Sequence, residues 1–277
     1  MKKFELTNET MTNDFGVKLF RIRALRELGT VKVGDKGGYI EKEENLSQDG
    51  NSWVYGNAQV SGNAQVSGNA QVYGDAQVYG DAQVSGDAQV SGNAGVSGNA
   101  QVYGDAQVYG DAQVSGNAGV SGDAWVHGHA CVFDDAFVYG NASVYGNSWV
   151  SGDALVHGNA CVFGNSWVSG DAQVYGDAQV SGDARVSGDA WVSGDARVYG
   201  DAVVYGDADY ATVKGFGREN RTTTFFRCKE GRLLVVCGCF SGDLDAFRKI
   251  VKKTHGDSKM ATEYLMIADL MEMHFKG

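Results

Sequence analysis

The stretch Ala58-Gln59-Val60-Ser61-Gly62-Asn63-Ala64-Gln65-Val66 repeats a hexapeptide, V-x-G-D/N-A-x, that recurs along more than half of the chain. From residue 54 to residue 204 a valine stands at every sixth position, twenty-six times in all. A small residue, Ala or Ser, precedes each valine by two positions. Helix faces recur every 3.6 residues and strand faces every two residues. A strict period of six therefore predicts a solenoid of very short strands joined by corners.

Within one hexapeptide the segment A-x-V-x alternates, which places Ala and Val inside and the two variable residues outside. Gly followed by Asn or Asp then forms the corner, because Gly readily adopts positive φ and Asn and Asp tolerate it best among the others. The chain contains no proline. This composition fits a solenoid, because each strand has to donate backbone hydrogen bonds to its neighbour.

The unit V-x-G-D/N-A-x resembles the hexapeptide motif of left-handed parallel β-helices, in which three hexapeptides form one triangular coil. The resemblance covers residues 51–208 and implies a left-handed parallel β-helix of about nine coils; the period alone does not give the hand. At about 4.8 Å per coil the repeat would be roughly 40 Å long. Residues 1–50 are then expected to form a small N-terminal β cap, which covers the exposed strand edge of the first coil.

The two ends of the chain have their own patterns. In the cap, residues 17–25 and 29–33 are predicted to be strands, and Ile40 and Leu46 already keep the spacing of six, so the first coil is expected to begin there. Residues 209–277 are predicted to form a ββαα module. Its strands are expected at residues 222–228 and 232–240, and its helices from Asp243 to about Thr254 and from Ser258 to about Phe275.

The whole layout resembles YdcK-like hexapeptide proteins of bacteria and their phages. The resemblance is carried by residues 29–47 before the repeat and by residues 237–242 and 254–257 after it. It implies a cytosolic protein of a bacterium, or of a phage acting in the host cytoplasm, and it brings no assigned activity.

The charge of the chain is unevenly distributed. Residues 51–208 contain sixteen Asp and two Arg, a net charge of −14, whereas residues 209–277 carry a net charge of +3. An acidic repeat repels the nucleic-acid backbone, so a DNA-binding role is not expected. Five cysteines form no paired framework and favour a reducing, cytoplasmic location. No signal peptide and no apolar run of membrane-spanning length is found, so no membrane association is expected.

The outward positions between residues 125 and 167 become apolar and aromatic, in contrast to the glutamines that precede them. A patch of this kind on a solenoid is typical of an interface. We therefore predict a homo-oligomer, a dimer or a trimer, or a surface on which a planar ligand stacks. The alternative is that the rings pack along their own columns. The residues concerned are Trp125, His127, Cys131, Phe133, Phe137, Tyr139, Trp149, Leu155, His157, Phe163 and Trp167.

Many hexapeptide proteins are acyltransferases, and this resemblance implies a trimer with acyl-CoA between subunits and a catalytic histidine. In this sequence His127 and His157 are the histidines that could take this catalytic role. Against catalysis, no loop interrupts the twenty-six repeats to close an active site, and the two histidines lie on different faces. His127-Gly128-His129 resembles a pair of histidines that chelate a metal ion. The sequence does not indicate the further ligands or the geometry that a metal site requires. We predict no catalytic residue, no metal site and no cofactor.

The sequence thus favours a non-catalytic, self-associating β-helix platform that binds a ligand or a partner. One specific hypothesis is a phage protein that sequesters a small host signalling nucleotide. The phosphates of such a ligand require basic groups. Alternatives are a hexapeptide-type acyltransferase and a purely structural spacer. The candidate anion-binding residues are Arg185, Arg197, Arg218, Arg221 and Arg227.

Overall fold

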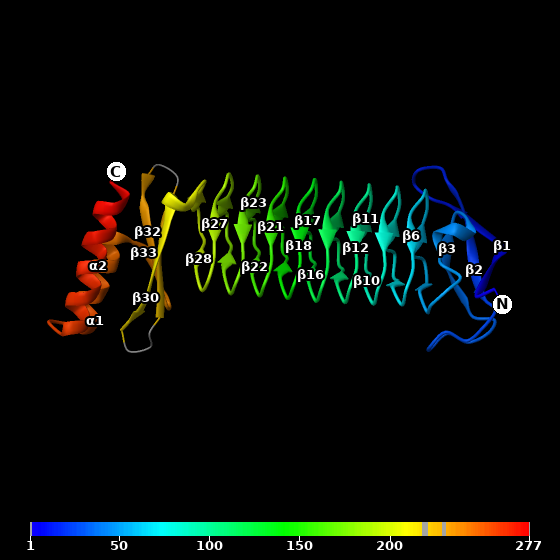
Figure 1. Ribbon diagram of the computed structural model, residues 1–277, viewed down its shortest axis with the longest axis horizontal. Helices are drawn as coiled ribbons and strands as arrows, with labels where there is room; N and C mark the ends of the chain where they lie inside the picture. The colour runs from blue at the N-terminus through cyan, green and yellow to red at the C-terminus, as the bar shows by residue number, and fades with distance from the viewer. Residues whose placement is uncertain (1, 218–220, 229–230, 277) are drawn as a thin grey trace. The chain divides into compact units, whose positions relative to one another are not determined.

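A computed structural model describes residues 2–217, 221–228 and 231–276 (Figure 1). The chain divides into two compact units, residues 1–153 and 154–277. Each unit contains part of the repeat, and each is described below by itself. The predicted candidate Arg218 lies outside the described residues.

The first unit contains a solenoid of two-residue strands arranged in three parallel sheets. The first sheet holds β5 (Gln59–Val60), β8 (Gln77–Val78), β11 (Gly95–Val96), β14 (Gln113–Val114), β17 (Cys131–Val132) and β20 (Trp149–Val150). The second holds β4 (Trp53–Val54), β7 (Gln71–Val72), β10 (Gln89–Val90), β13 (Gln107–Val108), β16 (Trp125–Val126) and β19 (Ser143–Val144). The third holds β6 (Gln65–Val66), β9 (Gln83–Val84), β12 (Gln101–Val102), β15 (Gly119–Val120) and β18 (Phe137–Val138).

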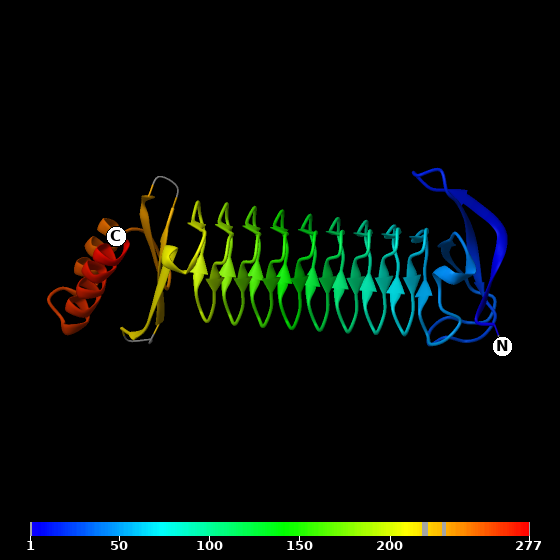
Figure 2. The same ribbon diagram turned by 45° about the horizontal axis from the view of Figure 1, so that its top comes forward.

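Residues eighteen positions apart stack directly, as in the pairing of Gln71 with Gln89 in β7 and β10. Each hexapeptide donates backbone hydrogen bonds to the next coil, for example from Tyr73 N to Val90 O at 3.0 Å and from Asp75 N to Gly92 O at 2.8 Å. Figure 2 shows the resulting rows of aligned strands in the cyan and green part of the ribbon. This ladder explains the absence of proline, because a proline at these donor positions would remove a bond between coils.

The interior of the solenoid consists of the Ala and Val columns, whose side chains are buried throughout. The corner glycines adopt positive φ, and at most of them, such as Gly68 and Gly92, a side chain would collide with the backbone of the next coil. Asp134 is the one non-glycine residue with positive φ, 59°, among the described residues. Its carboxylate accepts a hydrogen bond from Gly152 N at 3.2 Å, which compensates for part of the strain.

The N-terminal cap consists of β1 (Phe4–Thr12), β2 (Lys18–Ala24), β3 (Lys36–Ile40) and η1 (Glu43–Asn45). The first coil begins as predicted, because Ile40 pairs with Val60 and Leu46 forms a bridge with Val66. The prediction of a strand at residues 29–33 is wrong: only an isolated bridge between Leu28 and Val31 forms there. Strand β1 was not predicted, since its polar sequence gives no clear alternation; β2 supplies its partner.

The second unit continues the same repeat. Its parallel strands are β21 (Leu155–Val156), β24 (Gln173–Val174) and β27 (Trp191–Val192); β22 (Cys161–Val162), β25 (Gln179–Val180) and β28 (Arg197–Val198); and β23 (Trp167–Val168), β26 (Arg185–Val186) and β29 (Val203–Val204). Together the two units contain about nine coils of a parallel β-solenoid, which confirms the predicted fold class. The left hand of the coil stays a prediction from the resemblance.

After η2 (Asp207–Asp209) comes an antiparallel sheet of β30 (Tyr210–Phe216), β31 (Arg221–Arg227), β32 (Leu233–Cys237) and β33 (Phe240–Asp243). The two predicted strands are present as β31 and β32, and β30 and β33 extend the sheet on either side. The helices α1 (Leu244–His255) and α2 (Lys259–Phe275) match the prediction. Asp243 and Ser258 cap them by accepting from Ala246 N at 2.7 Å and Ala261 N at 3.3 Å.

Both helices of the second unit pack on one face of this sheet, in the orange and red part of Figure 2. The core between the layers contains Phe225 and Val235 from the sheet and Phe247, Val251 and Tyr264 from the helices. None of the described helices is long and apolar enough to cross a membrane. A cavity lies beside this core, lined by residues of the sheet and of both helices.

Candidate functional site

In the first unit the aromatic side chains of the repeat stack along their own columns. The rings of Tyr109, His127 and Tyr145 lie parallel, with centroids 4.7 and 5.0 Å apart. Trp149 lies edge-on to Phe133 at 5.6 Å. The ring of Phe137 covers Gly119 in the coil below. These contacts cover part of the apolar surface that was predicted to be an interface. Trp125 and Trp149 nevertheless stay exposed.

The second unit shows the same arrangement. The ring of His157 lies parallel to that of Tyr175 at 5.2 Å, and Tyr175 is edge-on to Trp191 at 6.5 Å. The guanidinium carbon of Arg185 lies 5.4 Å from the centroid of the exposed Trp167 ring, which is a cation–π contact. Of the remaining predicted interface residues, Tyr139 in the first unit and Leu155 and Phe163 in the second are half-buried on the outer surface.

Two of the three histidines of the repeat, His127 and His157, are held between or against aromatic rings. Burial lowers the pKa of His127 and of His157, which favours the neutral imidazole at physiological pH. Cys131 and Cys161 are also half-buried, and burial raises the pKa of their thiols. His127 and His157 are thus parts of stacked aromatic columns. Among the described residues no three His, Cys, Asp or Glu side chains gather in a way that would hold a metal ion.

The predicted anion-binding arginines do not all lie together in the structure. Arg185 is engaged with Trp167, and Arg227 forms an ion pair with Asp209 at 3.4 Å. Arg197 and Arg221, in contrast, line one polar groove of about 590 Å³ within the second unit. Lys214 lines the same groove and was missed by the sequence reasoning, because the strand that carries it was not predicted.

The basic groove is formed by three elements of the second unit. Arg197 comes from β28 of the solenoid, Lys214 from β30 and Arg221 from the first position of β31. A side chain at position 238 would collide with the guanidinium of Arg221, so Gly238, at φ +61°, allows that guanidinium to lie against the turn between β32 and β33. The sequence places these residues far apart, and only the pairing of the strands brings them together.

Lys214 forms an ion pair with Asp195, and Thr222 Oγ1 donates to the same carboxylate at 3.3 Å. The hydrogen bond and charge of Lys214 hold the pKa of Asp195 below its ordinary value, and Asp195 raises the pKa of Lys214 in return. Within the described part of the chain no carboxylate pairs with Arg197 or Arg221. The described lining residues thus include three cations and one anion, a net charge of +2.

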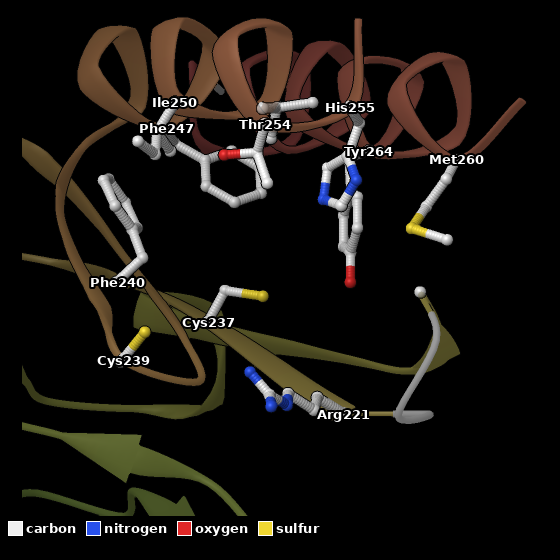
Figure 3. A pocket seen from close by; sticks show the side chains of 12 residues that line it. Arg221, Cys237, Cys239, Phe240, Phe247, Ile250, Thr254, His255, Met260 and Tyr264 are labelled. Carbon is white, nitrogen blue, oxygen red and sulfur yellow. The ribbon is translucent and has the colours of Figure 1, made fainter. Parts of the chain in front are cut away.

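A cavity of about 340 Å³ adjoins the groove and shares Arg221 and Cys239 with it. Figure 3 shows the cavity between the helices and the sheet of the C-terminal module. The rings of Phe240, Phe247, Tyr264 and His255 follow one another along it, and Phe247 meets Tyr264 edge-on at 5.9 Å. The thiol of Cys237 lies toward the middle of the space, and the guanidinium of Arg221 lies below it, at the lower edge. The cavity is thus lined by apolar groups and aromatic rings and has a cationic edge.

The aromatic rings that line the cavity are held in place by specific contacts. The rings of Phe240 and Phe247 are 5.5 Å apart, and those of His255 and Tyr264 are 6.0 Å apart and nearly parallel. Tyr264 Oη donates to Phe216 O at 3.3 Å. Burial raises the pKa of Tyr264 to about 12; Cys237 adds to this rise and Arg221 opposes it. The phenol therefore stays protonated and keeps its position at neutral pH.

Comparisons with known proteins concern the repeat. A model of the YdcK β-solenoid repeat family matches residues 58–74, 64–80, 70–86, 76–92, 88–104, 112–128, 136–152 and 178–194. No curated protein matches the chain. The matched segments lie in the solenoid of both units, and none includes the C-terminal sheet and helices. The parallel sheets and the matched repeats agree: the chain carries a parallel β-solenoid whose repeats are similar to those of the YdcK family.

Proposed function

We propose that this protein is a non-catalytic β-solenoid platform that captures a small phosphorylated ligand in its C-terminal module. The observation that carries the proposal is the convergence of Arg197, Lys214 and Arg221 on one groove. Guanidinium groups recognise phosphate oxygens through two parallel hydrogen bonds, and an ammonium adds a point charge. The three cations come from a solenoid strand and two strands of the C-terminal sheet.

The charge of the surroundings supports a bound anion. The chain as a whole carries a net charge of −11, yet this groove has an excess of positive charge. Like charges gathered in one groove repel each other, and a bound polyanion removes that repulsion. Among the described lining residues one carboxylate, Asp195, faces three cations: it forms an ion pair with Lys214 and lies within electrostatic reach of Arg197.

A nucleotide is the narrower form of this proposal. Sequestration of a host signalling nucleotide by a phage protein would require tight binding without turnover, and the packing of His127 and His157 against tyrosine rings fits a role without turnover. The acyltransferase alternative requires a histidine free to take a proton from a substrate. Self-association through the exposed tryptophans of the repeat is compatible with ligand capture, because a homo-oligomer would present several grooves.

The test is calorimetric titration of the full chain with inorganic pyrophosphate and with ADP at low ionic strength. Arg197→Gln and Arg221→Gln should each weaken binding by about tenfold, the usual effect of losing a charged hydrogen bond. Arg185→Gln is the matched control, because Arg185 packs on Trp167 outside the groove and its loss should leave affinity unchanged. The recovered ligand should be chemically intact. No binding of either probe, or equal binding by all three variants, would refute the proposal.

A further inference from the structure

Helix α2 is apolar on two opposite faces. Residues such as Tyr264 and Met271 fill the core against the sheet. On the opposite face Met266, Leu270 and Met273 are 67%, 52% and 68% exposed. Their spacing of four and three residues places them in one row along the helix, which we call the α2 stripe. A helix that is apolar on all sides is normally buried, so the α2 stripe is suited to contact with another surface.

One arginine compensates the acidic side chains where the two helices meet. Arg248 of α1 forms ion pairs with Asp245 at 3.5 Å and with Asp269 at 2.7 Å, and it also contacts Glu272. Asp245 and Asp269 are exposed, and an anionic membrane would bring lipid headgroups of like charge against them. A protein surface therefore suits this pair of helices better than a membrane.

The exposed side of α1 carries positive charge. Lys249, Lys252 and Lys253 are exposed, and among the described residues none of the three forms an ion pair. A contact of this face with the same face of a second copy would bring two sets of these lysines together, and like charges repel each other. The partner surface is therefore expected to be acidic and to expose apolar groups for the α2 stripe.

The repeat has such a surface in the first unit. Asp87, Asp105 and Asp123 are exposed and lie eighteen residues apart, so they stack in three successive coils. Within the described part of the chain no cation forms an ion pair with them. The exposed rings of Tyr103 and Trp125 lie two residues from this row, and we call the five residues the acidic ridge. Like charges on neighbouring strands are destabilising, so a bound cationic surface would relieve the repulsion along the ridge.

The two surfaces have similar spacings. Lys249 and Lys252 are about 4.5 Å apart along the axis of α1, and neighbouring residues of the α2 stripe are about 4.5 or 6 Å apart. The stacked carboxylates of the acidic ridge repeat at about 4.8 Å, the distance between coils. A helix that lies along the solenoid axis can therefore place successive side chains on successive coils.

We propose that the α2 stripe and the lysines of α1 dock on the acidic ridge of a second copy of the chain. The stripe covers the rings of Tyr103 and Trp125, and the lysines approach the three carboxylates. Each chain has one surface of each kind, so assembly continues from copy to copy unless the copies close into a ring. The two surfaces share no residue with the basic groove, and the contact does not depend on a ligand there.

The experiment uses two variants of the full chain, each lacking one surface. Met266→Gln/Leu270→Gln removes the α2 stripe at exposed positions, and glutamine has a high helix propensity. Asp105→Asn/Asp123→Asn removes two charges from the acidic ridge, and Asn stands at the same corner position in other repeats. Each variant should weaken self-association by about tenfold or more, measured by sedimentation velocity over a range of protein concentrations at low salt.

A mixture of the two variants gives the sharpest result. Each variant keeps the surface that the other lacks, so an equal mixture should form dimers with one copy of each and nothing larger. Asp171→Asn/Asp189→Asn is the matched control, because it removes two carboxylates eighteen residues apart elsewhere in the repeat. This control should assemble like the unmodified protein. Circular dichroism should be the same for all of these chains, which shows that each is folded.

Other results would overturn the inference. An unmodified protein that stays monomeric at every concentration would show that the two surfaces do not meet. Normal assembly of the ridge variant would show that the α2 stripe contacts itself or another part of the repeat. An equal loss in the control would reduce the effect to net charge. A monomer that sediments with phosphatidylglycerol vesicles would show that the helices face a membrane.

Discussion

At the scale of the residue, the corner glycines decide whether the coils can stack. Gly92 has φ +69°, and a methyl group there would lie 2.8 Å from Gly110 O and 2.9 Å from Gly110 N. Gly56 has φ +59°, but its nearest contact would be Gly74 O at 3.6 Å. The two glycines share the backbone conformation and differ in the space available.

Gly92→Ala should therefore destabilise the solenoid more than Gly56→Ala. Both substitutions carry the cost of a left-handed residue, about 1–2 kcal/mol. Gly92→Ala adds overpacking against a backbone that cannot move away, about 1–3 kcal/mol more. Urea unfolding followed by circular dichroism measures the difference. Equal losses for the two variants would show that conformation alone, without close stacking, explains the glycine column.

At the scale of the element, the N-terminal cap is fixed to the solenoid by a buried amine. Lys3 is fully buried, and its Nζ donates to Ser52 O at 2.8 Å and to Ser52 Oγ at 3.0 Å. Burial lowers the pKa of Lys3 to about 8; Arg26 adds to the decrease and Asp49 opposes it. The folded state thus releases the proton of Lys3 more readily than the unfolded chain does.

This difference predicts that stability rises with pH in one window. Below pH about 8 both states hold the proton, and above the ordinary value of 10.5 neither does. Between these values only the unfolded chain is protonated, so the free energy of unfolding increases with pH. Urea midpoints at about pH 7.5 and about pH 10 should show the rise, and Lys3→Met should reduce it. Lys2→Met, at an exposed amine, is the control and should keep it.

The C-terminal elements show which part of the site could be read from the sequence. The periodic apolar residues and the caps Asp243 and Ser258 predicted both helices correctly. Arg197 and Arg221 were found as basic residues in an acidic chain. Lys214 was missed because β30 continues directly from the end of the repeat and has no apolar alternation of its own. The cavity was missed because it depends on how the helices pack on the sheet.

At the scale of the whole molecule, charge is divided between the acidic repeat, net −14 over residues 51–208, and the basic C-terminal part, net +3 over residues 209–277. Repulsion along the repeat and attraction of an anion to the groove are both screened by salt. Salt should therefore act on stability and on binding in opposite directions.

Raising sodium chloride from about 20 mM to about 500 mM should increase the unfolding midpoint by a few degrees. The same change should weaken pyrophosphate binding by about tenfold or more. Thermal unfolding and calorimetry on the same samples measure both quantities, and potassium chloride serves as a control for specific ion effects. A midpoint that falls with salt would show that attractive ion pairs outweigh the repulsion between the aspartates of the repeat.

The sequence by itself determined the solenoid, because a period of six with Ala and Val inside and Gly at the corner leaves few ways to satisfy backbone and core together. It also determined the two helices, through local caps and periodicity. Only the tertiary structure decided that the aromatic columns stack upon themselves and that Arg197, Lys214 and Arg221 share a groove. Their proximity follows from strand pairing between segments distant along the chain, and local propensity carries no information about it.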